Sequence, residues 1–207
     1  AARVGVGHSA PMKELDTICR EAVAKNRTIH FLPPYRHDIM IQIFNLLGIR
    51  AEDQTARASM RLIRAVVKMR STKEPQEIEE LERAAVIGYK MHTTAMRLTR
   101  PGVTEKYIGG QVDGIAHSYG AMVSFPTILS QHGEIMHGAP SAQPLEAGRL
   151  MLCDAGAETM EGYCSDNTRT TPVSGKFTQR QLEIYSIVCD AHEILGEGFG
   201  VYAPGGL

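Results

Sequence analysis

Two aspartates, Asp154 and Asp166, lie in a segment that has the pattern of two β-strands joined by a turn near Thr159 to Gly162. If this hairpin is centred on Met160 without a bulge, the two carboxylates stand directly opposite each other on one face, with Cβ atoms about 4.5–5.5 Å apart. Such a pair repels unless cations neutralise it. Carboxylates suit Mn²⁺, and two ions about 3.5–4 Å apart turn a bridging water into a hydroxide nucleophile and polarise a carbonyl. The pair therefore predicts metal-assisted hydrolysis.

A plainer interpretation stays open beside this one. The two aspartates could be solvated residues of an ordinary hairpin, out of register because of a bulge at Gly156 or Gly162. Cys153 precedes the first aspartate, and by alternation it points to the opposite face of the strand. Glu158 and Glu161 lie in or beside the turn, where acidic residues are common, so we interpret them as surface residues.

Two histidines precede the hairpin in the segment from His132 to Gly138. Neither has a partner four residues away in a His-Glu-x-x-His setting, which excludes a zincin helix. A histidine on a strand ahead of the hairpin could reach the substrate side of the metals. From the residues alone, either histidine could equally be structural or exposed.

The elements that must position these side chains follow from periodicity and end signals. Apolar spacing predicts helices over 11–25, 36–47 and 75–98, and another that begins at the capping residue Thr104. Segments rich in β-forming residues predict strands over 28–32, 121–130, 150–157 and 163–173. A capping box at 178–181 opens the last helix. Helices, then antiparallel-looking strands, then a helix predict an α+β fold.

The bulk properties exclude several classes of function. The 207 residues carry a formal net charge of -1, which favours neither nucleic acid nor an anionic membrane. No apolar run approaches the roughly 20 residues of a membrane helix, and no secretion signal is visible. Four cysteines without Cys-x-x-Cys spacing are typical of free thiols, so we expect a cytoplasmic protein without a disulfide framework.

An ordered series of short motifs resembles the creatinase/aminopeptidase P group of "pita-bread" metallopeptidases. The resemblance covers roughly residues 70–193, and the series is specific although no single motif is. The motifs are Lys73-Glu74-Pro75-Gln76-Glu77-Ile78, Pro101-Gly102-Val103-Thr104-Glu105, Phe125-Pro126-Thr127-Ile128, His137-Gly138, Asp154-Ala155-Gly156-Ala157-Glu158, Gly162-Tyr163, Ser165-Asp166-Asn167-Thr168-Arg169-Thr170 and Phe177-Thr178-Gln179-Arg180-Gln181.

The resemblance implies a catalytic domain of two similar halves around a curved antiparallel sheet with flanking helices. Residues 71–207 would be the first half, and residues 1–70 would be the end of an N-terminal domain and a linker. Five ligands hold two divalent ions in this family, with Mn²⁺ expected here and Co²⁺ or Zn²⁺ as alternatives. Asp154 and Asp166 match two of the ligands, and His137 matches the histidine that binds substrate or shuttles a proton.

The remaining ligands of the family, one His and two Glu, belong to the second half, so we expect the chain as given to be an inactive fragment that binds Mn²⁺ weakly. The implied activity is that of a dinuclear Xaa-Pro aminopeptidase, in which metal-bound hydroxide releases the residue ahead of proline. The alternatives are a prolidase, a creatinase-like hydrolase or a non-catalytic interaction module of the same fold. The implied partners are a peptide with proline second and, in a homo-oligomer, further copies of the chain.

Overall fold

A computed structural model of the protein describes residues 7–198, and the chain divides into two compact units, Ala1–Lys73 and Glu74–Leu207. The assignment of residues 1–70 to the end of an N-terminal domain, and of residues 71–207 to half of a catalytic domain, remains a prediction. None of the helices in the described range combines the length and apolar content that crossing a bilayer requires.

The first unit is helical. Gly48 ends its second helix in the left-handed conformation (φ 67°), which glycine adopts without strain. The Gln54 side chain is fully buried and donates through Nε2 to the carbonyl oxygens of Met40 (2.8 Å) and Ile49 (2.9 Å). These bonds tie the third helix to the second. The helices are α1 (Glu14–Ala24), α2 (His37–Leu47), α3 (Ala51–Arg57) and α4 (Met60–Ser71).

The strand predicted over residues 28–32 is wrong, because this segment is irregular. A strand needs a neighbour to pair with its backbone, and the described part of the first unit offers none. The carbonyl of Phe31 instead accepts one hydrogen bond from the N–H of Ser59 (3.0 Å). Local β-propensity without a partner therefore did not produce a strand.

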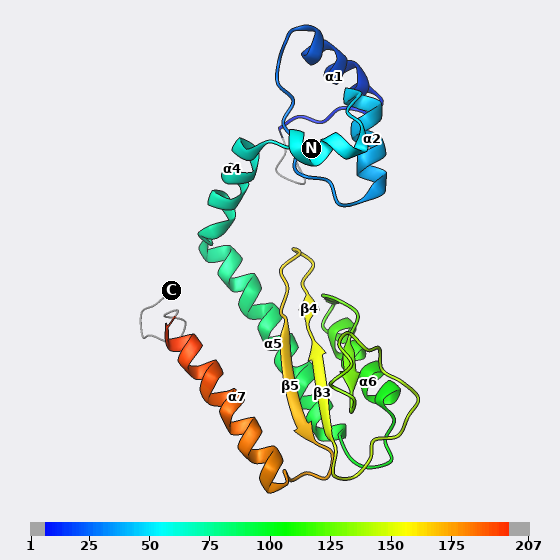
Figure 1. Ribbon diagram of the computed structural model, residues 1–207, viewed down its shortest axis with the longest axis vertical. Helices are drawn as coiled ribbons and strands as arrows, with labels where there is room; N and C mark the ends of the chain where they lie inside the picture. The colour runs from blue at the N-terminus through cyan, green and yellow to red at the C-terminus, as the bar shows by residue number, and fades with distance from the viewer. Residues whose placement is uncertain (1–6, 199–207) are drawn as a thin grey trace. The chain divides into compact units, whose positions relative to one another are not determined.

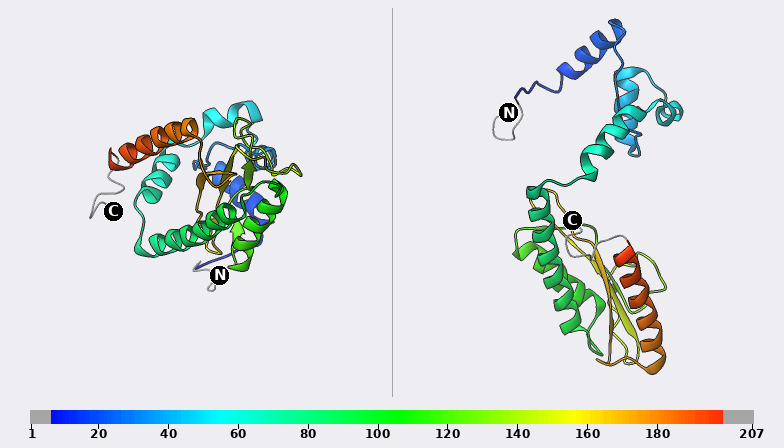
Figure 2. Two further views of the ribbon diagram at one scale, coloured as in Figure 1. Left: turned by 90° about the horizontal axis from the view of Figure 1, so that it is seen from below. Right: turned by 90° about the vertical axis from the view of Figure 1, so that its left-hand side faces the viewer.

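The second unit combines helices with short antiparallel strands, as predicted (Figure 1). In both views of Figure 2 the strands β3 and β5 lie between α5 and α7. The elements are α5 (Pro75–Leu98), α6 (Glu105–Ser118), β1 (Met122–Val123), β2 (Ile128–Ser130), β3 (Leu150–Ala155), β4 (Ala157–Glu158), β5 (Asn167–Pro172) and α7 (Gln179–Gly198).

The core of the second unit forms where α5 and α6 pack together and against the strands. α5 begins with a capping box between Glu74 and Glu77, and α6 begins where Thr104 Oγ1 accepts the N–H of Tyr107 (3.2 Å). Burial of the larger apolar side chains contributes about 1.5–3 kcal/mol each. The core includes Ile87, Met91, Ala95, Ile108, Val112, Ala116, Leu129, Met151, Cys153, Ala155 and Val173.

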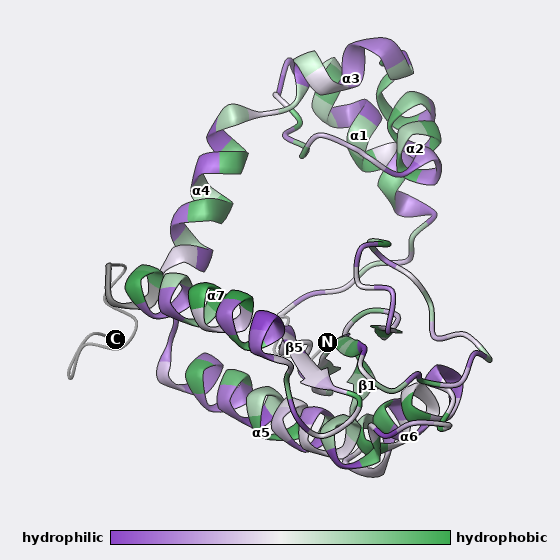
Figure 3. Ribbon diagram, turned by 60° about the horizontal axis from the view of Figure 1, so that its bottom comes forward, coloured by the Kyte–Doolittle hydropathy of each residue, from purple (hydrophilic) through white to green (hydrophobic). Residues whose placement is uncertain are grey.

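The last helix also begins as predicted. The Thr178 N–H donates to Gln181 Oε1 (2.9 Å), and the Gln181 N–H donates to Thr178 Oγ1 (3.3 Å), which completes the capping box. Hydrophobic residues recur along α7, where Figure 3 colours the ribbon green, and several of them have exposed side chains. They are Leu182, Ile184, Ile187, Val188, Ile194 and Leu195.

The main sheet has the order β2-β3-β5, so β3 is the central strand and both of its neighbours run antiparallel to it. Met151, Cys153 and Ala155 are buried in the core, and the residues between them are half-buried. The alternation that placed Cys153 and Asp154 on opposite faces is confirmed. Asp154 therefore lies on the face of β3 that points away from the core helices.

The predicted register of the hairpin is wrong by one residue at its centre. Asp154 pairs with Thr168 rather than with Asp166, and Thr159 pairs with Tyr163, so the hairpin is centred on Glu161. The turn explains the difference. The N–H of Gly162 donates to the Thr159 carbonyl (2.9 Å), and Gly162 itself is left-handed (φ 81°), which is the geometry of a three-residue loop.

Candidate metal centre

Asp154 occupies the middle of the sheet, where its strand has a neighbour on each side. Its backbone partners are Ile128 on β2 and Thr168 on β5. One carboxylate oxygen, Oδ1, is buried and has no hydrogen-bond partner among the described residues. An ionised oxygen in that state is costly unless a cation approaches it.

Asp166 lies on the same side of the sheet as Asp154 in spite of the changed register. It precedes Thr168 by two residues, and strand residues two apart share a face. The pKa of Asp154 is raised, first by partial burial, while a hydrogen bond from Thr168 opposes the rise and the charge of Asp166 adds to it. The two carboxylates are therefore close enough to repel each other.

The segment between the two aspartates is held by an unusually close backbone contact. A Cβ atom on Gly156 would overlap the carbonyl oxygen of Ser165, so only glycine fits there. Ser124 donates through its N–H to Gly156 O (3.0 Å) and through Oγ to Ser165 O (2.9 Å). The Ala157 N–H donates to Ser165 Oγ (3.0 Å). These bonds fix the positions from which both carboxylates project.

His92 supports the site from the core side. It is 5% exposed, it lies on α5, and its Nε2 is 3.1 Å from the carbonyl oxygen of Ala155, the residue after Asp154. Burial lowers its pKa, which favours the neutral ring, while the carbonyl of Ala155 acts in the opposite direction. A neutral ring donating from Nε2 fixes the end of β3.

The donor set fits a hard or borderline divalent cation. Both candidate ligands are carboxylates, the charge pair is uncompensated, and one buried oxygen lacks a partner. Within residues 7–198, no group of three or more His, Cys, Asp or Glu side chains is arranged to hold a metal. The described residues thus offer a pair of candidate ligands, fewer than a complete metal site requires.

The two histidines of the sequence analysis lie in the loop that follows β2. His137 is exposed and has a left-handed backbone (φ 59°), which is uncommon for a residue other than glycine. His132 Nδ1 lies 3.0 Å from Glu134 Oε1, and this hydrogen bond lowers the pKa of the Glu134 carboxyl. Among the described residues, neither histidine forms a hydrogen bond or ion pair with the aspartates, so the substrate-side role of His137 stays a prediction.

Sequence reasoning missed three residues around the site. No sequence signal distinguishes His92 from an ordinary core histidine, although its hydrogen bond to Ala155 joins α5 to the strand of Asp154. Thr168 could have been found by alternation, because it shares a face with Asp166. Glu105 resembles any acidic residue in a first helical turn, and no local signal marks its burial.

A pair of packed helices behind an antiparallel sheet, with two carboxylates on the opposite side of that sheet, is the arrangement expected of the pita-bread metallopeptidases. The chain belongs to metallopeptidase family M24, whose model matches residues 79–199. This result confirms the family that the motifs predicted, and the α+β prediction is confirmed with it.

Similar proteins in the family are Xaa-Pro aminopeptidases. The chain is 40% identical over 158 residues to that of Escherichia coli (strain K12), covering 74% of this chain and 35% of that protein. It is 34% identical over 145 residues to Xaa-Pro aminopeptidase 2 of Streptomyces coelicolor, covering 68% of this chain and 30% of that protein. The chain thus spans about a third of the length of these curated relatives.

Solved structures share the fold. A substituted Escherichia coli aminopeptidase P in complex with substrate gives a TM-score of 0.73 at 29% identity and covers 93% of this chain and 45% of that chain. The Xaa-Pro dipeptidase of Bacillus anthracis gives 0.66 at 25% identity, with 89% and 50% covered. Both kinds of Xaa-Pro peptidase are therefore structural neighbours.

Proposed function

We propose that this chain provides part of the active site of an Xaa-Pro aminopeptidase, with Asp154 and Asp166 as two ligands of a dinuclear metal centre. The observation that carries the proposal is the carboxylate pair on the outer face of the β3–β5 sheet, where Asp154 Oδ1 is buried without a partner. Membership of metallopeptidase family M24 supports it. The remaining ligands are not among the described residues.

Divalent ions bound there would polarise the scissile carbonyl and lower the pKa of a water molecule. The residues of this chain orient the ligands. Thr168 holds the Asp154 carboxylate by a hydrogen bond, and His92 holds the strand end next to it. His137 is proposed to bind the substrate or move a proton on the substrate side. Mn²⁺ is the expected metal, with Co²⁺ or Zn²⁺ as alternatives.

The proposed substrate is a peptide with proline as its second residue, and a cytoplasmic homo-oligomer is the proposed state of the protein. Prolidase activity is the second candidate, because structures described as prolidase and Xaa-Pro dipeptidase match the same fold. The two activities differ in the length of the substrate. Comparing an Xaa-Pro dipeptide with an Xaa-Pro-Yaa tripeptide separates them.

The test uses, in Mn²⁺ buffer, the longer protein to which this chain is proposed to belong; it is called the full-length protein below. We expect cleavage of the tripeptide by the wild type, and a loss of at least about a hundredfold in kcat/KM for D154N or D166N, because even changes to the groups that orient a ligand cost about 10–100-fold. Asp190→Asn changes an exposed aspartate on α7 and serves as the matched control. The proposal is wrong if D154N and D166N retain the activity of D190N.

Cleavage of the dipeptide alone would replace the aminopeptidase assignment by prolidase and leave the metal ligands unchanged. Loss of bound Mn²⁺ in D154N and D166N, measured by calorimetry, would support the ligand assignment independently of substrate. Unchanged Mn²⁺ binding in both variants would refute it.

A further inference from the structure

A buried glutamate, Glu105, holds the loop that carries His137 and is not one of the proposed metal ligands. Glu105 is the first residue of α6 and is only 2% exposed, although it carries a carboxylate. Burial acts to raise the pKa of this group, but hydrogen bonds from the backbone and hydroxyl groups outweigh it and lower the pKa. Glu105 is thus held as a buried anion.

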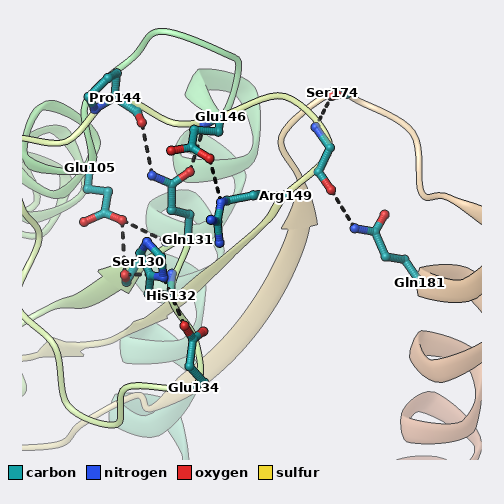
Figure 4. A network of polar contacts seen from close by, with 11 residues as sticks. Glu105, Ser130, Gln131, His132, Glu134, Pro144, Glu146, Arg149, Ser174 and Gln181 are labelled. Atoms are coloured by element: carbon teal, nitrogen blue, oxygen red, sulfur yellow. Dashed lines mark hydrogen bonds and ion pairs between the residues drawn. The ribbon is translucent and has the colours of Figure 1, made fainter.

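The two carboxylate oxygens serve two separate segments of chain. Oε1 accepts the N–H of Gln131 (2.8 Å) and the hydroxyl of Ser130 (3.1 Å). Oε2 accepts both the N–H (3.0 Å) and the hydroxyl (2.7 Å) of Ser141. Figure 4 shows the first pair beside the Gln131 network. One side chain therefore joins the two ends of the loop between residues 131 and 141.

Neighbouring bonds close the same loop from outside. The Lys106 N–H donates to Ser141 O (2.8 Å), and the Glu105 N–H donates to Gln143 O (3.2 Å). Gln131 donates through Nε2 to Pro144 O (3.0 Å) and accepts the N–H of Glu146 through Oε1 (2.8 Å), as Figure 4 also shows. Both ends of the loop are consequently fixed to α6 and to each other.

The interior of the loop has few bonds of its own. Among the described residues, the one hydrogen bond between backbone groups inside the loop runs from the Ile135 N–H to His132 O (2.9 Å). His137 lies here with its left-handed backbone (φ 59°), a conformation that persists only where the surroundings impose it. The position of His137 therefore depends on how the loop ends are held.

The loop lies over the face of the sheet that carries the carboxylates. A Cβ atom placed on Gly133 would be 3.6 Å from the Cβ and Cδ1 atoms of Leu152. Leu152 precedes Asp154 by two residues on β3 and shares its face. The loop therefore contacts β3 at Leu152, two residues before Asp154.

We propose that Glu105 is the positioning residue of His137, acting through the loop rather than by contact with substrate. This inference rests on the proposed function of His137. The carboxylate is needed because both oxygens face donors at once. The amide of E105Q would turn its NH₂ group toward the N–H of Gln131 or of Ser141. Two donors cannot bond to each other, so one end of the loop would lose its bond to residue 105.

Hydrogen–deuterium exchange on the 207-residue chain tests the anchor without using activity. In E105Q we expect the amides of residues 131–141 to exchange about tenfold faster or more, because bonds to a charged group are lost, while β3 and β5 keep their protection. E82Q makes the same change at an exposed glutamate on α5, outside the loop, and is the matched control. Equal acceleration in β3 and β5, or no change in the loop, would overturn the proposal.

If E105Q does not fold, S141A removes a single donor to the same carboxylate and should give a smaller acceleration confined to the loop. Acceleration in S141A that spreads into β3 and β5, or its absence from the loop, counts against the anchor. The same two variants can then be compared in the full-length protein.

A double-mutant cycle with H137A tests positioning in the full-length protein. We expect E105Q to lower kcat/KM about tenfold on the wild-type background and to have no further effect on H137A, because it acts through that histidine. Equal losses on both backgrounds would show a general structural role and refute positioning. A wild-type protein without peptidase activity would refute the proposed function, while the exchange result would still decide whether Glu105 anchors the loop.

Discussion

Asp154→Asn should stabilise the metal-free chain, which is an unusual expectation for a half-buried residue in the centre of a sheet. The substitution keeps the shape of the side chain and removes its charge. The raised pKa of Asp154, caused first by burial and also by Asp166, means that the ionised carboxylate is disfavoured in the fold. Removing the charge relieves both the desolvation of Asp154 and the repulsion from Asp166.

Coulomb's law gives the size of the effect. At about 7 Å, the spacing of diagonal neighbours on adjacent strands, the repulsion is about 0.6 kcal/mol in bulk water and about 2.4 kcal/mol at the effective dielectric of a protein surface. Because Asp166 is exposed to solvent, we take a value near the lower limit, about 1 kcal/mol. A gain of that size raises Tm by about 3–5 °C for a unit of this length.

Divalent metal should make the wild-type chain more stable than D154N, the reverse of the order expected without metal. Wild-type chain in Mn²⁺ at about ten times Kd gains about 1.4 kcal/mol from binding to the native state. D154N has lost a ligand and should gain little. The D154N variant is therefore expected to melt above wild type in EDTA and below it in Mn²⁺.

The assay is thermal unfolding followed by circular dichroism at pH 7.5, in EDTA and in a Mn²⁺ series. D190N, an exposed charge change on α7, should stay within about 0.5 kcal/mol of wild type in both buffers. The reasoning is refuted if D154N is less stable than wild type in EDTA, since the charge pair would then not be repulsive. Equal Mn²⁺ shifts for both proteins would refute the ligand role.

Further predictions concern other parts of the second unit. Gly156→Ala should cost about 3 kcal/mol in urea unfolding, because its methyl group has no space, whereas Gly110→Ala, with open space on α6, should stabilise by about 0.4–1 kcal/mol. The lowered pKa of Glu105 contributes stability that is present above its unfolded value of 4.5 and is lost as pH falls through the folded value, so the stability difference between wild type and E105Q should shrink in acid. Burial raises the pKa of Cys153 to about 12, so a thiol reagent at pH 8 should modify exposed Cys164 and leave Cys153 unreacted until the chain unfolds.

Local signals predicted the helices well because the groups that end a helix are close in sequence. Gly48, Thr104 and the Thr178–Gln181 capping box all act where periodicity and end signals placed them. The strand over residues 28–32 failed for the opposite reason. Its existence depended on a partner elsewhere in the chain, and propensity carries no information about such a partner.

The residues that the sequence predicted lie near one another in the chain, whereas the residues that it missed reach their partners from distant positions. Asp154 and Asp166 belong to one hairpin, so alternation relates them directly. His92 reaches the same site from a helix 63 positions away along the chain, through a bond to Ala155. Glu105 joins segments 26 and 36 positions away. Such contacts follow from the packing of helices on the sheet, which periodicity does not specify.

The error in the hairpin register leaves both aspartates on one face of the sheet, so the metal site stays a prediction that the corrected register still allows. A left-handed Gly162 moves the centre of the hairpin by one residue, which changes the partner of Asp154 by two, from Asp166 to Thr168. Because side chains alternate with a period of two, a shift of two preserves the face, whereas a shift of one would have buried one carboxylate in the core. The corrected register also places Thr168 opposite Asp154 on the same face, where its hydroxyl can orient the carboxylate. A hairpin with one residue inserted between Glu158 and Gly162 would therefore be expected to lose Mn²⁺ binding, while an insertion of two would retain the shared face.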